Sequence, residues 1–210
     1  MAPSRSKALA ASAGLSLLFL LVYGGCIWIT SRRSDVGVFY FGWERGIPFV
    51  PFFILPYLSI DLFFVVAPFL LPDEHQLKLF VRRVAAAILI SGIFFVLLPL
   101  RFAFARPEAT GWLGALFDWF RGVDRPFNLF PSLHAALCLL LWPVYAQQLH
   151  GLLRRAVLCW FGLIALSPLL THQHHGVDIA GGFAVAGGCF IGIRLKNSLA
   201  SAERPATSSA

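Results

Sequence analysis

Six long apolar runs, separated by short polar or basic segments, make up most of the chain. Five of these runs contain no Asp, Glu, Lys or Arg, and the second contains one acid, Asp61. A helix that crosses a bilayer needs about 20 mainly apolar residues. The pattern therefore predicts an all-α fold with six transmembrane helices, at 8–31, 46–72, 84–100, 126–150, 156–177 and 179–193. The last run is short for a crossing unless its flanking residues extend the helix.

The composition indicates a membrane protein and excludes an ordinary water-soluble domain. Of the 210 residues, 58% are hydrophobic and only 13% are charged, and the mean hydropathy is +0.76. So little polar surface cannot coat a globule in water. We expect a single membrane domain over 1–196 with a motif-bearing core at 84–194. The tail at 197–210, rich in Ser, Ala and Pro, is expected to be disordered.

The basic residues predict an orientation. With the N-terminus placed in the cytoplasm, the 17 Lys and Arg residues divide into ten in the cytoplasmic segments and seven in the outer ones. Because basic residues favour the cytoplasmic side, both termini are expected there. The expected location is the inner membrane of a bacterium, with the active site on the periplasmic or extracytoplasmic side. The net charge of +7 also suits an anionic membrane surface.

Three of the six histidines stand close together between the last two apolar runs. Ionisable side chains at membrane depth are costly unless they are paired or functional, so this stretch is a candidate site. His174 and Asp178 are four residues apart, so on a helix they share a face, and the carboxylate can hold the imidazole in one tautomer. This pair is the predicted nucleophile or base with its orienting acid.

Two further groups of polar residues flank the third and fourth runs. Arg101 and Arg106 follow the third run, and Ser132 and His134 open the fourth. Pro131 suits a first helical turn, which would leave the next two amides unpaired at a positive helix end, a ready anion site. Arg106 offers planar, permanently charged donors that match phosphate oxygens. Counting the crossings places all three groups at one membrane face, and together they predict phosphoryl transfer.

At these residues the chain resembles the type 2 phosphatidic acid phosphatase superfamily, which also includes the vanadium haloperoxidases. The resemblance covers the third to sixth runs and follows three motifs in order, at Arg106-Pro107, at Pro131-Ser132-Leu133-His134, and at Ser167 with His174 and Asp178. Pro99 and Pro168 occupy two positions where the family has basic residues, and Leu133 replaces a glycine. In motif form the chain is closest to the inositol-phosphorylceramide synthase and sphingomyelin synthase branch.

The resemblance implies a lipid phosphate phosphatase or phosphotransferase that works through a phosphohistidine. His174 would be the nucleophile, with Asp178 orienting it, and His134 would protonate the leaving oxygen and later deprotonate the acceptor. Arg106 and Ser132 would hold the phosphoryl oxygens. The implied substrate is a lipid phosphate or an isoprenoid phosphate among the membrane lipids. No metal or other cofactor is required, and nucleic acid is not expected as a partner.

Arg101 is the nearest residue that could replace the missing basic positions, because it lies at the same end of the third run as Arg106. On an ideal helix the two arginines would point about 140° apart. The chain must therefore unwind before Pro107 if both are to reach one phosphate.

Several alternatives stay open from the sequence. By helical geometry alone His175 rivals His174 as the residue that Asp178 orients, and only the family spacing selects His174. The three histidines, with His172, could instead bind zinc or copper, or Asp61 in a proline-broken second helix could form the midplane site of a transporter. Within the enzymatic interpretation the acceptor can be water or an alcohol, and an alcohol would make the protein a headgroup transferase of the inositol-phosphorylceramide synthase type. The oligomeric state is left open.

Overall fold

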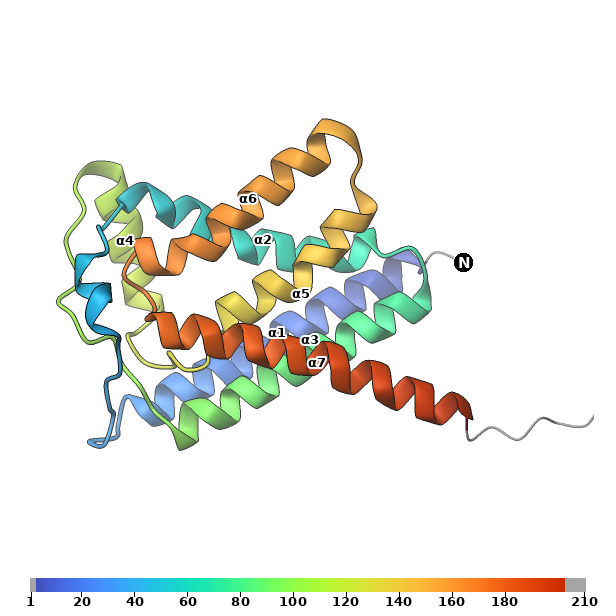
Figure 1. Ribbon diagram of the computed structural model, residues 1–210, viewed down its shortest axis with the longest axis horizontal. Coiled ribbons are helices and arrows are strands. Elements are labelled where there is room, and N and C mark those ends of the chain that lie inside the picture. The colour runs from blue at the N-terminus through green and yellow to red at the C-terminus, as the bar shows by residue number, and fades with distance from the viewer. Residues whose placement is uncertain (1–2, 203–210) are drawn as a thin grey trace, which may run out of the picture.

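The structure is a computed structural model that describes residues 3–202, and the side chains of residues 3–193. Every regular element in this range is a helix (Figure 1). The α-helices are α1 (Arg5–Thr30), α2 (Ile54–Leu70), α3 (Glu74–Leu97), α4 (Gly111–Val123), α5 (Leu133–Gln148), α6 (Gly151–Leu170) and α7 (Gly176–Ala202). Two short 3₁₀ helices, η1 (Gly42–Gly46) and η2 (Pro51–Phe53), lie between α1 and α2. Of the predicted tail, α7 includes the first residues, and 203–210 lie outside the described residues.

Five helices within the described range are long and apolar enough to cross a membrane. They are α1, η2 together with α2 (Pro51–Leu70), α3, α6 and the first part of α7 (Gly176–Ile193). This agrees with the predicted all-α membrane protein. The remaining predicted crossing, 126–150, contains α5, which has only 16 residues because the chain before Leu133 is not helical.

The second crossing is regular although it carries several prolines. Pro51 begins η2, Pro56 lies in the first turn of α2, and Pro68 lies in its last turn. The N–H groups in the first turn of a helix have no acceptor within the helix, so Pro51 and Pro56 remove no helical hydrogen bond. The expected unwinding is limited to the 3₁₀ turn, and α2 is continuous through Asp61.

The helix α5 occupies the centre of the bundle, where it contacts α2, α3, α6 and α7 (Figure 1). Most of its side chains are buried. Its approach to α7 is closest at Gly182, where an added Cβ would lie 2.2 Å from the carbonyl oxygen of Ser132 and 2.9 Å from the Cβ of Ala135. A glycine at this position is therefore required for α5 and α7 to pack as they do.

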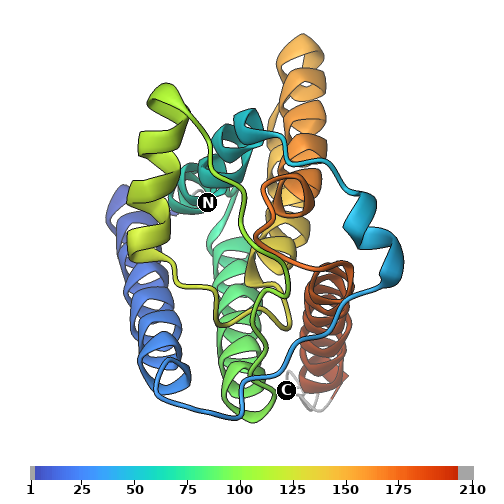
Figure 2. The ribbon, with the colours of Figure 1, turned by 90° about the vertical axis from the view of Figure 1, so that its left-hand side faces the viewer.

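Long connecting segments and α4 lie across one end of the bundle, which we call the covered end (Figure 2). The helices α3 and α6 run toward this end, and α5 and α7 begin at it (Figure 1). Here α4 packs against α2 in a small apolar cluster formed by Phe117 and Phe120 with Ile54 and Tyr57. The connection between the third and fourth predicted crossings therefore contains a helix, which packs over the end of α2.

Replacing Gly182 with alanine should lower the free energy of unfolding by about 1–3 kcal/mol, the usual cost of overpacking, because the Ser132 carbonyl cannot yield unless α5 shifts. The measurement is the melting temperature of the purified protein in detergent. Gly187→Ala is the matched control on the same helix, since an added Cβ there meets nothing within 4 Å. Equal melting temperatures for the two variants would contradict this packing.

Candidate functional site

The three segments that carry the predicted site residues meet at the covered end. The backbone N–H of Ala103 donates a hydrogen bond to Nε2 of His175 at 3.0 Å, and the backbone N–H of Ser132 donates to the carbonyl oxygen of Asp178 at 2.8 Å. These bonds join the segment after α3, the start of α5 and the start of α7. The three segments that carry the motifs are therefore neighbours in space.

His174 and Asp178 lie together where α7 begins. The Asp178 carboxylate accepts a hydrogen bond from the backbone N–H of His175 at 2.8 Å, as the acid of a capping box does, which fixes it at the helix N-terminus. Its Oδ2 atom lies 3.6 Å from Nδ1 of His174, slightly beyond hydrogen-bond distance. The two side chains are only 7% (His174) and 0% (Asp178) exposed. The carboxylate can thus orient the ring through Nδ1, which leaves Nε2 for a ligand.

A cavity of about 420 Å³ lies beside His174. It is enclosed by α1, α2, α4 and α5, and most of its wall is aliphatic or aromatic. His134 lines this cavity together with His174. The other polar side chains in its wall are those of Ser16, Tyr23, Tyr57, Asp61, Asp124 and Asn128. Both the volume and the mainly apolar wall are typical of a small-molecule site.

His134 is held in one tautomer. Its Nε2 atom lies 3.2 Å from the carbonyl oxygen of Ile164, and because a carbonyl oxygen only accepts, Nε2 carries the proton. The imidazole stacks on Tyr57, with ring centroids 4.4 Å apart. Nδ1 is therefore the nitrogen with which His134 can give or take a proton.

His175 uses both of its ring nitrogens in contacts within the protein. Nδ1 lies 2.6 Å from Oε2 of Glu44, Nε2 accepts the bond from Ala103, and the ring stacks on Phe102 with centroids 4.4 Å apart. An imidazole enclosed in this way has no nitrogen to offer a substrate. Of the adjacent pair, His174 is the one that lines the cavity.

Nothing in the sequence singles out Glu44, the partner of His175. The two residues are 131 positions apart, so no local spacing connects them. Oε1 of Glu44 accepts hydrogen bonds from the backbone N–H of Phe41 at 2.9 Å and of Gly176 at 3.2 Å. One buried carboxylate thus joins η1 to the first residue of α7.

Arg106 is half-buried, and its Nε–H finds no acceptor among the described residues. Burial lowers the pKa of its guanidinium, and the charge of the Asp124 carboxylate opposes that shift. Asp124, which the sequence motifs do not include, accepts a hydrogen bond from the Tyr23 hydroxyl at 2.7 Å. Burial raises the pKa of Asp124, whereas this bond and the charges of His174 and Arg106 lower it. Arg106 is therefore a partly desolvated cation close to the cavity.

Two predicted phosphate ligands, Arg101 and Ser132, do not line the cavity. The Arg101 side chain is exposed, and its backbone N–H donates to the carbonyl oxygen of Gly37 at 2.9 Å. Ser132 caps α5, with its hydroxyl accepting from the backbone N–H of Ala135 at 3.2 Å. Its own amide, expected to be unpaired and ready for an anion, is bonded to the Asp178 carbonyl. In this arrangement Ser132 positions helices, and Arg101 makes no side-chain hydrogen bond with the described site residues.

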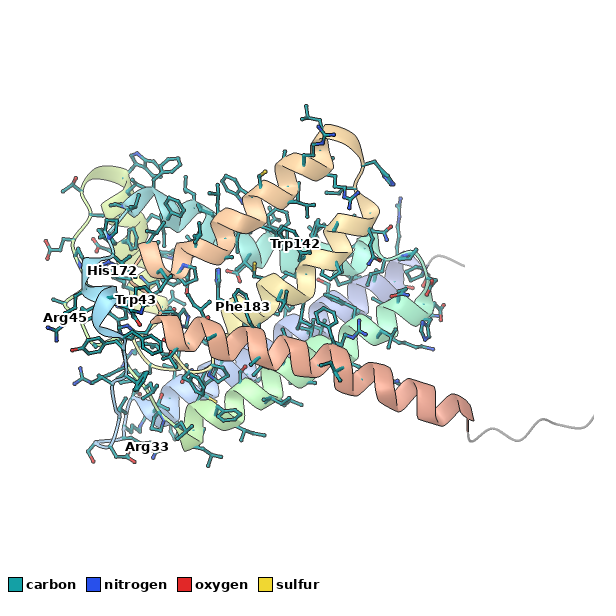
Figure 3. The ribbon with its side chains drawn as sticks, in the orientation of Figure 1. Arg33, Trp43, Arg45, Trp142, His172 and Phe183 are labelled. Atoms are coloured by element: carbon teal, nitrogen blue, oxygen red, sulfur yellow. The ribbon has the colours of Figure 1, made fainter. Side chains whose placement is uncertain are left out.

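The three neighbouring histidines face three different partners. His172 lies at the covered end with Trp43 (Figure 3), and its Nε2 atom lies 3.2 Å from the carbonyl oxygen of Ile47. His174 faces Asp178, and His175 faces Glu44 as described above. Within the described range, no three His, Cys, Asp or Glu side chains are arranged to hold a metal ion. The zinc or copper site considered from the sequence therefore has no convergent ligand set here.

Comparison with protein-family models, with curated proteins and with solved structures finds no match to this chain. Its function must therefore be inferred from its own residues. Those residues supply an oriented imidazole, a second imidazole with one free nitrogen, a half-buried guanidinium and an apolar cavity. These groups can attack, protonate and hold a phosphoryl group attached to an apolar body.

Replacing Glu44 with alanine should lower the free energy of unfolding by about 3 kcal/mol or more, because each buried donor left without an acceptor costs about 1–3 kcal/mol. The change leaves the Nδ1–H of His175 and two backbone N–H groups buried without an acceptor. The measurement is again the melting temperature in detergent. Glu108→Ala, at an exposed position of the α3–α4 connection, should have the same melting temperature as the wild type. A Glu44→Ala protein with the same melting temperature as the wild type would contradict the proposed importance of this contact.

Proposed function

We propose that the protein is a membrane-embedded lipid phosphate phosphatase or phosphotransferase that acts through a phosphohistidine at His174. The observation that supports this most directly is that His174 and His134 line one apolar cavity, while the rival His175 is fully engaged with Glu44 and Ala103. The resemblance to the type 2 phosphatidic acid phosphatases, carried by the motif residues, points to the same chemistry.

In the first step, Nε2 of His174 attacks phosphorus and the bond from phosphorus to the lipid oxygen breaks. Asp178 stabilises the positive charge that the ring acquires, since its carboxylate lies 3.6 Å from Nδ1. The departing oxygen takes a proton from Nδ1 of His134, which must enter this step as an imidazolium. The products are a lipid alcohol, neutral His134 and phosphorylated His174.

In the second step, water or an alcohol gives its proton to Nδ1 of His134 and its oxygen bonds to phosphorus. The phosphorus–nitrogen bond breaks, and its electron pair returns to Nε2 of His174. Arg106 is the cation that would hold the equatorial oxygens in both steps, because its Nε–H has no other acceptor among the described residues. With a lipid alcohol as the acceptor, the same two steps make a headgroup transferase.

The proposal includes a sixth crossing by α5 and places the covered end on the extracytoplasmic side. A helix of 16 residues spans about 24 Å, less than the roughly 30 Å of a hydrocarbon core. The preceding chain can complete the crossing because Asn128 and Leu129 are buried in protein, and irregular backbone is tolerated at membrane depth where protein surrounds it. The excess of basic residues at the opposite end supports cytoplasmic termini, as in the inner membrane of a bacterium.

Purified protein should release inorganic phosphate from dioleoyl phosphatidate or from an isoprenyl phosphate, or transfer the phosphoryl group to an added lipid alcohol. The activity should persist in a chelator, because every proposed step uses protein side chains. The readout is phosphate release and labelled lipid product, with His174→Ala as the inactive control. An absence of turnover on all these substrates, or its complete loss in the chelator, would refute the proposal.

Labelled phosphate should be trapped on His174 when the reaction is quenched during turnover. His174→Ala should form no acid-labile phosphoenzyme and should lose at least roughly 10³-fold in turnover. His175→Asn keeps a side-chain N–H for Glu44, so it should still form the phosphoenzyme with a lower melting temperature. A phosphoenzyme that survives in His174→Ala and is lost in His175→Asn would move the nucleophile by one residue.

A further inference from the structure

The cavity beside the histidines is elongated along α1. The residues of α1 that line it recur every three or four positions, so they form one stripe, consisting of Ser16, Phe19, Leu20, Tyr23, Gly24 and Ile27. From the first to the last of these the helix rises about 16 Å. The stripe of α2 that faces the same cavity runs from Tyr57 to Val65. The cavity therefore extends from the covered end well into the bundle.

Its two ends differ in polarity. His134, His174 and Asp124 lie at one end, where Tyr23 bonds to Asp124. Toward Ser16 most of the wall is apolar, with Ser16 and Asp61 as its polar side chains. Beyond that point the hydroxyl of Ser12 donates to the carbonyl oxygen of Val65 at 2.9 Å, so α1 and α2 close together. This is the shape of a site for an amphiphile whose polar end meets the histidines.

The position of Arg106 favours this orientation over the opposite one. Among the described residues no Lys or Arg lines the cavity, whereas Asp61 and Asp124 do. Asp124, at the histidine end, interacts electrostatically with Arg106, so a cation is close to that end and can hold the phosphate there. The rest of the cavity suits the uncharged body of a lipid. His174, only 7% exposed and without a side-chain hydrogen bond among the described residues, marks the place where the two parts of the ligand would join.

The cavity also opens sideways. Leu20, Val65 and Trp119 line it and are nonetheless 65%, 42% and 62% exposed. Leu20 and Val65 belong to helices that are long and apolar enough to cross a membrane, so this opening faces the acyl layer. A lipid could enter from the leaflet without passing through water, which is the low-energy route for an apolar chain.

Resting on the proposed function, we propose that this cavity binds the apolar chain of the substrate and that Gly24 of α1 keeps it open. Gly24 lines the cavity, and a Cβ added there meets nothing within 4 Å. A large side chain at this position can therefore enter the cavity without displacing the backbone. The helix α1, which carries none of the family's motif residues, thus determines which lipids can bind.

The test compares Gly24→Phe with Gly25→Phe on two substrates. The neighbouring Gly25 has equally open space at its Cβ and does not line the cavity, so Gly25→Phe controls for bulk and helix propensity. Gly24→Phe should lower kcat/KM for dioleoyl phosphatidate about tenfold or more, the effect of excluding about two methylene groups, mainly through KM. Gly24 is next to Tyr23, at the histidine end of the cavity, so kcat/KM for dibutyryl phosphatidate should fall as well, whereas Gly25→Phe should change neither. No loss on either substrate in Gly24→Phe, or an equal loss in Gly25→Phe, would overturn the assignment.

Photo-crosslinking of the wild-type protein decides the question independently of turnover and of variant folding. A phosphatidate with a photoreactive group in its long chain should label peptides containing 16–27 and 57–65. Labelling confined to α3 and α7 would overturn the chain site. If the wild type turns over no lipid phosphate yet is labelled on α1 and α2, the proposed reaction fails while the lipid-chain site stands.

Discussion

The arrangement of the covered end depends on the buried contact between Glu44 and His175. Glu44 accepts hydrogen bonds from the ring of His175 and from the amides of Phe41 and Gly176, and Ala103 donates to the other side of the ring. A buried carboxylate that loses its partners costs several kcal/mol. Displacing any one of these segments would therefore destabilise the contacts of the others. The start of α7, and with it His174, is therefore fixed by two connecting segments from distant parts of the chain.

The same contact explains why two adjacent histidines have different environments. His174 and His175 both precede α7, which begins at Gly176. With the ring of His175 turned toward Glu44, that of His174 faces the cavity and the Asp178 carboxylate. His172 lies before the helix with a positive φ of 54° and turns toward Ile47. Histidines that are neighbours in the sequence therefore have different contacts in the structure. Of these three, His174 is the one that lines the cavity.

The sequence was a good guide where local periodicity carries the information. Apolar runs predicted six membrane-spanning helices, and five helices in the described range are long and apolar enough to cross a membrane. The His174–Asp178 spacing suggested two neighbouring side chains, and they do lie 3.6 Å apart, but only Asp178 is in the first turn of α7, because the helix begins at Gly176. Contacts between remote segments left no such trace, which is why Glu44 and the Asp124–Tyr23 pair were not anticipated. Ser132 illustrates the limit: the sequence predicted an unpaired amide there, but the fold brings the Asp178 carbonyl to that amide. The α4 helix was passed over because 13 residues are too few to cross a membrane.

Pro99 and Pro168 stand where the superfamily that the motifs resemble has basic residues, so under the proposed function the site has few positive charges. Pro168 instead shapes the loop before α7, because its carbonyl oxygen accepts hydrogen bonds from the backbone N–H groups of Gln173 and His174. The helices α5 and α7 both begin at the covered end, and each helix N-terminus carries about half a positive charge. Asp178 offsets the charge of α7, so under the proposed function Arg106 remains the main full positive charge for a phosphate. Phosphate affinity would then depend on one guanidinium, and the lipid chain in the cavity would have to supply much of the remaining binding energy.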